Sequence, residues 1–149
     1  MPSKRTSASS VKSPVNKSDY VVIFDGGSIG NPGKGYGSYL LQSPTGKEVH
    51  ERIEFPEING PMTNNQAEYR TLIKGLYHLI ELLGDRVPAS SIRIEGDSQL
   101  VLNQLDGRWK VKHEGLKPLH EETSRLIKRF SGFKCVWHSR DRSVSILGH

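Results

Sequence analysis

The chain contains 149 residues with one cysteine, Cys135, so it fits a single domain and excludes an internal disulfide framework. No apolar run approaches the roughly 20 residues of a membrane-spanning helix, and the first residues contain no hydrophobic signal region. We therefore expect a cytoplasmic protein without a membrane segment.

The formal net charge of +5 is concentrated in the first part of the sequence. Residues 1–18 contain Lys4, Arg5, Lys12 and Lys17 and no acid, so the remaining body is nearly neutral. This segment is rich in serine and poor in apolar residues, which predicts a disordered basic tail. A transit peptide, a nonspecific polyanion tether and a solvated leader all fit its composition, and the net charge by itself does not indicate a nucleic-acid-binding surface.

The first predicted element is a buried strand at residues 21–24, where four apolar residues follow one another. Asp25 ends this run, and a carboxylate removed from water is costly unless a partner, often a cation, compensates its charge. The alternative is a turn-initiating aspartate before Gly26 and Gly27. Six glycines and Pro32 between residues 26 and 37 favour instead a long loop that something approaches closely, and their spacing matches neither the Walker pattern nor GxGxxG.

Residues 36–42 and 48–55 are predicted to be two further strands, separated by a turn with the sequence SPTG. The second of them alternates charged and apolar residues, which is typical of a half-exposed strand. Three successive strands with these connections predict an antiparallel meander.

A helix is predicted to begin after Thr63, because Thr63 and Gln66 match a capping box. Gly84 ends this helix. Its apolar stripe has helical spacing and consists of Leu72, Ile73, Leu76, Leu79, Ile80 and Leu83. Glu68 lies one turn before the stripe, on or beside the face that packs on the sheet. The alternative for Glu68 is a solvated acid in the first turn, which the helix dipole favours.

Strands and helices alternate in the second half of the chain. Residues 92–95 and 133–137 are predicted to be strands and residues 99–105 and 116–130 helices, while residues 139–149 have no clear pattern. Asp97 follows the first of these strands, where a helix cap is the common role of such a residue. The order of elements predicts a mixed α/β domain.

Asp25, Glu68 and Asp97 share a placement, because each lies where a strand ends or where the first long helix begins. A strand–helix–strand crossover sets its two strands side by side with the helix over their face, so the three carboxylates can converge. Clustered carboxylates shift one another's pKa, and a divalent cation with a preference for oxygen, above all Mg²⁺, compensates their charge. Two such ions about 4 Å apart suit phosphoryl transfer.

Three segments contain these acids, in the order FDGGSIGNPGKGYG, TNNQAEY and GDSQLV. Together they resemble the type 1 ribonuclease H family over residues 19–142. The resemblance implies an α/β fold of ribonuclease H type: a five-stranded mixed sheet, with three antiparallel strands followed by parallel strands, and helices on both faces. It also implies a hydrolase, an endonuclease that cleaves the RNA strand of RNA–DNA hybrids with two Mg²⁺ ions, for which Mn²⁺ can substitute, and leaves 5′-phosphate and 3′-hydroxyl ends.

By the same resemblance, Asp25 bridges both ions, while Glu68 and Asp97 hold the ion on the leaving-group side. Contacts with the hybrid are implied for Gly27, Asn31, Asn64, Asn65 and Gln99. A 2′-hydroxyl both donates and accepts hydrogen bonds, so amide side chains can distinguish RNA from DNA. Turn and cap chemistry is the alternative for the two adjacent asparagines.

The segment between the helices predicted at 99–105 and 116–130 is too short for the basic protrusion with which some family members grip the hybrid. Lys110, Lys112 and His113 are the available substitutes. Trp109 is expected either to pack on a sugar of the DNA strand, as an aromatic residue does in parts of the family, or to anchor the core.

The last part of the sequence departs from the family pattern. When SRD at residues 139–141 is aligned with the usual Pro-Arg-Glu, the fourth metal-binding acid falls on Leu147, which cannot bind a metal. Asp141 and His149 are the surrogates to consider. His138 and His149 are candidates for the mobile proton-handling histidine of some members.

The sequence therefore predicts a monomeric ribonuclease H whose partner is an RNA–DNA hybrid. It consists of the tail at residues 1–18 and a ribonuclease H-like domain at residues 19–149 that lacks the last helix. The alternative is an RNA–DNA hybrid or RNA binding module with weak or no catalytic activity.

Overall fold

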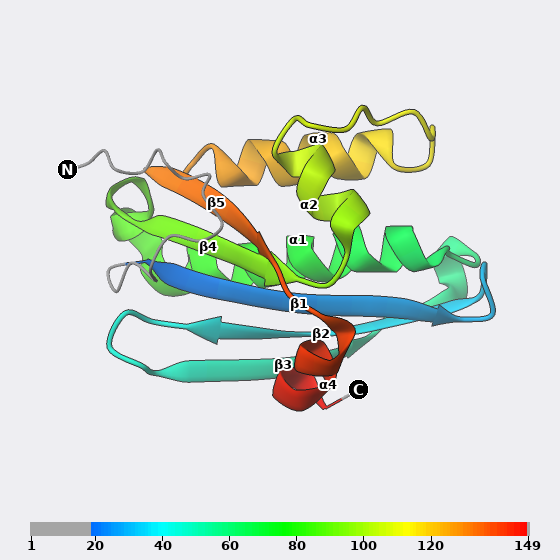
Figure 1. Cartoon of the computed structure of the whole chain (residues 1–149), viewed down its shortest axis with the longest axis horizontal. Coiled ribbons are helices and arrows are strands. Elements are labelled where there is room, and N and C mark those ends of the chain that lie inside the picture. Colours follow the sequence, from blue (N-terminus) through cyan, green and yellow to red (C-terminus); the bar gives the residue numbers. More distant parts are fainter. Residues whose placement is uncertain (1–18, 149) are drawn as a thin grey trace.

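The computed structural model describes residues 19–148 (Figure 1), so the predicted tail and His149 lie outside the described residues. Five strands form one mixed sheet in the order β3-β2-β1-β4-β5, which confirms the predicted fold class. The strands are β1 (Tyr20–Ile29), β2 (Lys34–Gln42), β3 (Glu48–Glu54), β4 (Ser91–Gly96) and β5 (Gly132–Trp137). The helices are α1 (Asn64–Leu83), α2 (Gln99–Leu105), α3 (Lys117–Ile127) and α4 (Arg140–Leu147), with short 3₁₀ helices η2 (Glu57–Asn59) and η3 (Gly84–Ala89).

β1 and β2 form a long antiparallel hairpin, because β1 continues through Asp25 to Ile29 instead of ending at the acid. Asp25 pairs with Ser38 in the middle of this ladder. The long glycine loop predicted after Asp25 is therefore wrong, and residues 30–33 alone connect the two strands. Most of the glycines lie inside the strands, where glycine often marks the close approach of another backbone.

The sheet has an antiparallel part and a parallel part. β1, β2 and β3 form the predicted antiparallel meander, while β4 lies parallel to β1 and β5 lies parallel to β4. α1 connects the meander to β4 and runs along the sheet (Figure 1). Both halves of the predicted capping box at its start are present, since the Thr63 side chain accepts from the Gln66 amide and the Gln66 side chain accepts from the Thr63 amide.

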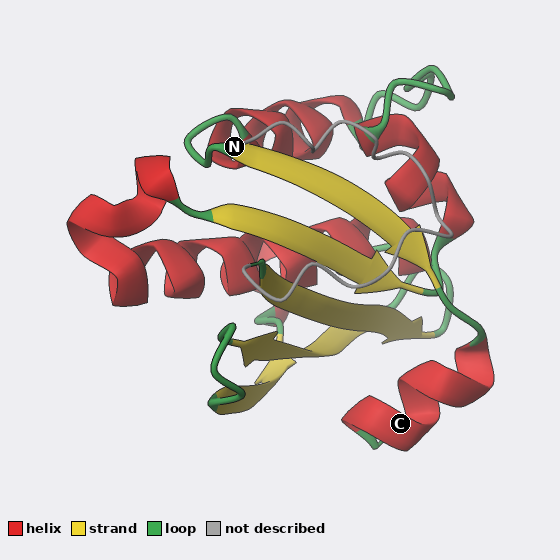
Figure 2. Ribbon diagram, turned by 60° about the vertical axis from the view of Figure 1, so that its left-hand side comes forward, coloured by secondary structure: helices red, strands yellow, loops and turns green. Residues whose placement is uncertain are grey.

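The main core lies between the sheet and the helices α1, α2 and α3, which cover one face (Figure 2). Alternate residues of β1, Val22 and Phe24, point into this core, and Tyr69 and Leu72 of α1 meet them there without exposed surface. Their neighbours Val21 and Ile23 point to the other face of the sheet, as alternation along a strand requires.

α4 covers part of that other face, on the opposite side of the sheet from α1 (Figure 2). Leu147 is fully buried there against Val21, Ile23 and Leu40. The expectation that the domain lacks its last helix is therefore wrong. α4 has eight residues and only Ser143 and Leu147 buried, so it has no apolar stripe that a periodicity argument could detect. Across residues 19–148, no helix has the length and apolar character needed to cross a membrane.

Candidate metal centre and nucleic-acid interface

Three acids that are far apart in the sequence meet at one point of the fold. One carboxylate oxygen each of Asp25, Glu68 and Asp97 lies within 4.8 Å of the others. Asp25 comes from the middle of β1, Glu68 from the first turns of α1, and Asp97 from the residue that follows β4. Asp25 and Glu68 are buried, and the Asp97 side chain is only 8% exposed. The convergence predicted from the sequence is thus present in the structure.

Glu68 can reach the sheet because Gly26 lets α1 come close. A Cβ atom on Gly26 would stand 2.6 Å from the backbone oxygen of Ala67, so any side chain would force the helix away. At this short separation the Gly26 amide donates a 2.9 Å hydrogen bond to Oε1 of Glu68. The solvated first-turn acid considered for Glu68 is therefore wrong.

Burial raises the pKa of Asp25 to about 6, and the negative charge of Asp97 contributes to the same direction. The pKa of Glu68 is raised well above its ordinary value, first by burial and then by the charges of Asp25 and Asp97. The guanidinium of Arg140 lowers the pKa of both groups, and its Nη1 lies 3.8 Å from Oδ2 of Asp97. Three acids in this environment favour a positive charge among them.

The donor set fits a hard divalent cation. It consists of carboxylate oxygens only, which Mg²⁺, Mn²⁺ and Ca²⁺ prefer over nitrogen or sulfur. Oδ2 of Asp97 is buried and has no hydrogen-bond partner among the described residues, and a buried polar atom of this kind calls for a ligand or ion. The acids can therefore hold a divalent ion.

Among the described residues, neither Leu147 nor Asp141 belongs to this group. Leu147 is buried in the apolar cluster behind the sheet, and Asp141 is exposed in the first turn of α4. His138 is buried: its Nε2 lies 2.7 Å from Oγ of Ser143 and its Nδ1 lies 3.4 Å from Oε1 of Glu95. These contacts hold His138 in the fold, so it is not the mobile histidine that was considered. His149 lies outside the described residues.

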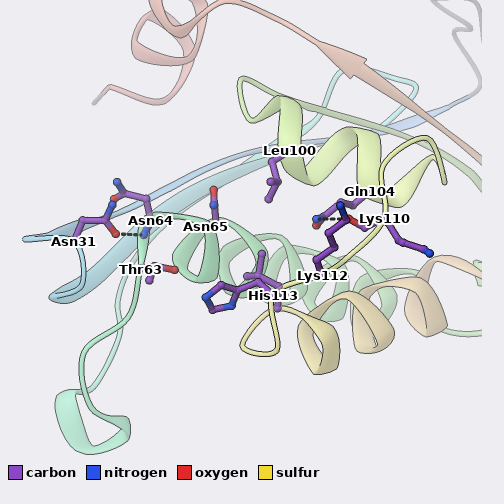
Figure 3. Close-up of a pocket in the computed structure, with 10 residues that line it drawn as sticks. Asn31, Thr63, Asn64, Asn65, Leu100, Gln104, Lys110, Lys112 and His113 are labelled. Carbon is purple, nitrogen blue, oxygen red and sulfur yellow. Dashed lines mark hydrogen bonds between the residues drawn. The ribbon is translucent and has the colours of Figure 1, made fainter.

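A pocket of about 520 Å³ opens beside the first turn of α1 (Figure 3). Asn31, Asn64 and Asn65 line one side, and Lys110, Lys112 and His113 line the other. The three asparagines and the three substitute basic residues thus surround the same space. Since Asn64 and Asn65 lie about one turn before Glu68, the pocket is adjacent to the acids along α1.

Asn31 and Asn64 also perform the turn and cap chemistry considered for such residues. Oδ1 of Asn31 accepts from the Asn64 amide at 3.0 Å, and Oδ1 of Asn64 accepts from the Ser28 amide at 2.9 Å. These bonds tie the β1–β2 turn to the start of α1. Both asparagines therefore have a structural role in addition to their position in the pocket.

The other predicted contact residues lie outside this pocket. Gly27 is buried under Tyr36, whose hydroxyl would stand 2.7 Å from a Cβ atom added to Gly27. Gln99 is exposed at the start of α2, two residues after Asp97. Trp109 is 46% exposed, so it is not a core anchor. An exposed tryptophan in the loop that carries Lys110 remains consistent with a nucleic-acid contact.

Gln104 is a pocket residue that the sequence analysis missed. Its Oε1 accepts a 2.6 Å hydrogen bond from the buried hydroxyl of Tyr69, and its Nε2 donates to the backbone oxygen of Lys110 at 3.4 Å. His120 contacts the backbone oxygen of Gln104 at 3.1 Å. These bonds position the loop that carries Lys110 and Lys112. The only signal in the sequence is a polar residue between Leu102 and Leu105 of α2.

The sheet order and the acids at the carboxyl end of β4 and in the middle of β1 define a domain of the ribonuclease H class. The sequence model of the family described as Reverse transcriptase-like matches residues 24–145. The chain therefore belongs to this family of ribonuclease H-like domains, which confirms the resemblance to type 1 ribonuclease H.

Individual relatives agree with this assignment. The chain is 38% identical over 125 residues to the bifunctional protein Rv2228c of Mycobacterium tuberculosis. The aligned region covers 83% of this chain and 32% of that relative. It is 36% identical over 107 residues to Ribonuclease HI of Halobacterium salinarum, covering 72% of this chain and 50% of that protein. The chain thus spans from about a third to half of the length of these curated relatives.

Solved structures have the same fold. The N-terminal RNase H domain of Rv2228c, solved as a fusion with maltose binding protein, superposes with a TM-score of 0.74 at 32% identity, over 87% of this chain and 95% of that one. RNase H1 of Halobacterium salinarum superposes with a TM-score of 0.73 at 30% identity, over 87% of this chain and 93% of that one. LC11-RNase H1 in complex with an RNA/DNA hybrid superposes with a TM-score of 0.75 at 25% identity, over 85% of this chain and 90% of that one.

Proposed function

We propose that this domain is a divalent-metal-dependent endonuclease, a ribonuclease H that hydrolyses the RNA strand of RNA–DNA hybrids and leaves 5′-phosphate and 3′-hydroxyl ends. The observation that carries the proposal is the group formed by Asp25, Glu68 and Asp97, whose oxygens lie within 4.8 Å of one another beside a pocket of amide and basic side chains. Family membership supports the same activity.

The three acids would hold Mg²⁺, with Mn²⁺ as a substitute, because a carboxylate-only site favours hard cations. When bound, such an ion activates water and stabilises the leaving oxygen of a phosphodiester. The protein's part is to keep the three carboxylates together at low exposure. The Gly26 amide fixes one oxygen of Glu68 by a 2.9 Å bond, so the carboxylate is oriented before the ion arrives.

The hybrid would lie across the acids and the adjacent pocket. Lys110 and Lys112 offer positive charge for phosphates, and Asn65 offers an amide that can contact a ribose hydroxyl or a base edge. The exposed side chains of Gln99 and Trp109 extend this surface around α2. The presence of an RNA/DNA hybrid in the LC11-RNase H1 structure supports this substrate class. A monomeric state and a cytoplasmic location stay predictions from the sequence.

The second candidate is a binding module for RNA–DNA hybrids or RNA with weak or no cleavage. One observation favours it: Leu147, at the position where the family has its fourth acid, is buried against Val21, Ile23 and Leu40. The contact surface would then be retained while turnover is reduced.

Cleavage of an end-labelled RNA–DNA hybrid in Mg²⁺ and in Mn²⁺ separates the two candidates. The wild type is expected to cut the RNA strand, and Asp25→Asn is expected to lower the rate by at least about a hundredfold by removing a ligand. Asp141→Asn removes an exposed acid outside the group and serves as the matched control, with wild-type activity. Binding of the hybrid without any cut product in either metal would reject the enzyme and support the module.

A further inference from the structure

An arginine flanks the three acids on the side of α4. The other acids of this region do not belong to the group: Glu95 pairs with Arg93 and contacts His138, and Asp141 is exposed. Arg140 is the first residue of α4, and its Nη1 lies 3.8 Å from Oδ2 of Asp97. That distance is too long for a hydrogen bond but within the range of an ion pair. The guanidinium therefore lies where a positive charge is needed beside the three carboxylates.

The position of Arg140 is set by buried contacts of its neighbours. The His138 amide donates to the backbone oxygen of Gly96 at 2.9 Å, next to Asp97. His138 also bridges Oγ of Ser143 on α4 and Oε1 of Glu95 on β4, at 2.7 and 3.4 Å. The first turn of α4 is thereby held against the end of β4. Although the Arg140 side chain is 68% exposed, its backbone is fixed beside the site.

Leu147, whose side chain has no ligand atom, has a packing role. It is the last residue of α4, it has no exposed surface, and it covers Val21 and Ile23 on the face of β1 to which Asp25 also belongs. A carboxylate at this position would be buried among apolar side chains, which is costly. The leucine is therefore part of the core that anchors α4.

The charges of the site agree with a single ion. Three ionised carboxylates carry three negative charges, and one divalent ion together with one guanidinium neutralises them. A second divalent ion would have to approach a guanidinium and the first ion without a further anionic ligand from the described residues. Like charges at such separations repel each other, and water screens the repulsion in part because the Arg140 side chain is exposed.

We infer that this site binds one divalent ion in place of the pair known from the family, and that Arg140 supplies the second positive charge. This inference rests on the proposed function, since it concerns the same acids. It assigns Arg140 to the binding machinery of the site, where its charge competes with a cation in the free protein and is available to a phosphate in the complex.

The test counts bound ions in the free protein by titration with Mn²⁺, followed by calorimetry and by the electron paramagnetic resonance signal of unbound Mn²⁺. The wild type is expected to bind one ion. Arg140→Ala is expected to bind one ion about three- to tenfold more tightly at low salt, with a smaller difference at high salt, because a nearby cation has been removed. Arg140→Lys, which keeps the charge, should bind nearly as the wild type does.

Arg142→Ala is the control, because Arg142 is an exposed arginine on the same helix. It is expected to leave the affinity unchanged. Two ions of similar affinity in the wild type would overturn this inference and leave the proposed nuclease intact, whereas no bound ion would overturn both. Equal affinities of Arg140→Ala and Arg142→Ala would also overturn the role assigned to Arg140.

Discussion

The substitution Leu147→Ala tests whether α4 is an integral part of the domain. Leu147 has no exposed surface and contacts a small cluster of Val21, Ile23 and Leu40. Leucine-to-alanine changes at buried sites cost about 2–5 kcal/mol, and the cost is smaller where the surroundings can collapse into the space. Because this cluster is small and lies under a short helix, we expect a loss of about 2–3 kcal/mol.

Urea unfolding followed by circular dichroism measures this loss, and a fall in Tm of about 6–10 °C should accompany it. Val144→Ala is the control, because Val144 lies on the same helix with 45% of its surface exposed, and it should change the free energy of unfolding by less than about 0.5 kcal/mol. A loss below about 1 kcal/mol for Leu147→Ala would show that α4 does not pack on the sheet.

Three further predictions concern the acids and the packing around them. The pKa of Asp25 is raised from 3.8 to about 6, so the folded state holds this proton more tightly than the unfolded state. The free energy of unfolding in EDTA should therefore fall as pH rises from about 4 to 6, and less steeply in Asp25→Asn, as followed by urea titrations. Gly37→Ala would place a Cβ atom 1.9 Å from Oγ1 of Thr71, so it should push α1 from the sheet and cost about 1–3 kcal/mol in the same titration. Tyr69→Phe removes the 2.6 Å bond to Gln104 and should cost about 1–2 kcal/mol, and it should weaken hybrid binding, as measured by fluorescence anisotropy, because the neighbouring loop loses support.

A different experimental outcome would contradict each of these three predictions. An equally steep fall of the free energy of unfolding between pH 4 and 6 in the wild type and in Asp25→Asn would contradict the raised pKa of Asp25. An unchanged denaturation midpoint for Gly37→Ala would contradict the close contact between α1 and β2. Hybrid binding unaffected by Tyr69→Phe would show that the loop carrying Lys110 and Lys112 does not contact the hybrid.

Much of the fold followed from local patterns in the sequence. The helix after Thr63 was predicted at the correct residue because capping is a short-range interaction with specific residue types. The length of β1 was not predicted, because Gly26 and Gly27 have the pattern of loop residues. The role of Gly26 depends on α1, a helix that is distant in sequence. α4 was missed because its one buried apolar residue, Leu147, gives no periodicity.

The site also contains residues that the sequence predicts and residues that it does not. The acids could be predicted because Asp25, Glu68 and Asp97 each stand at the end of a predicted strand or near the start of the first long helix, and the family motifs surround them. Arg140 and Gln104 could not, because their importance comes from contacts between elements. Nothing in the residues next to Arg140 indicates that its guanidinium lies beside Asp97.

The three acids come from β1, α1 and the end of β4, so the metal site can form only after these elements have come together during folding. β1 and β4 become neighbours only when the parallel pairing between Tyr20 and Ile92, far apart along the chain, has formed. Such long-range pairings are slow to form compared with helices and hairpins. The luminescence of a lanthanide present during refolding should therefore increase when β1 pairs with β4. A domain in which this pairing has not formed should show no increase.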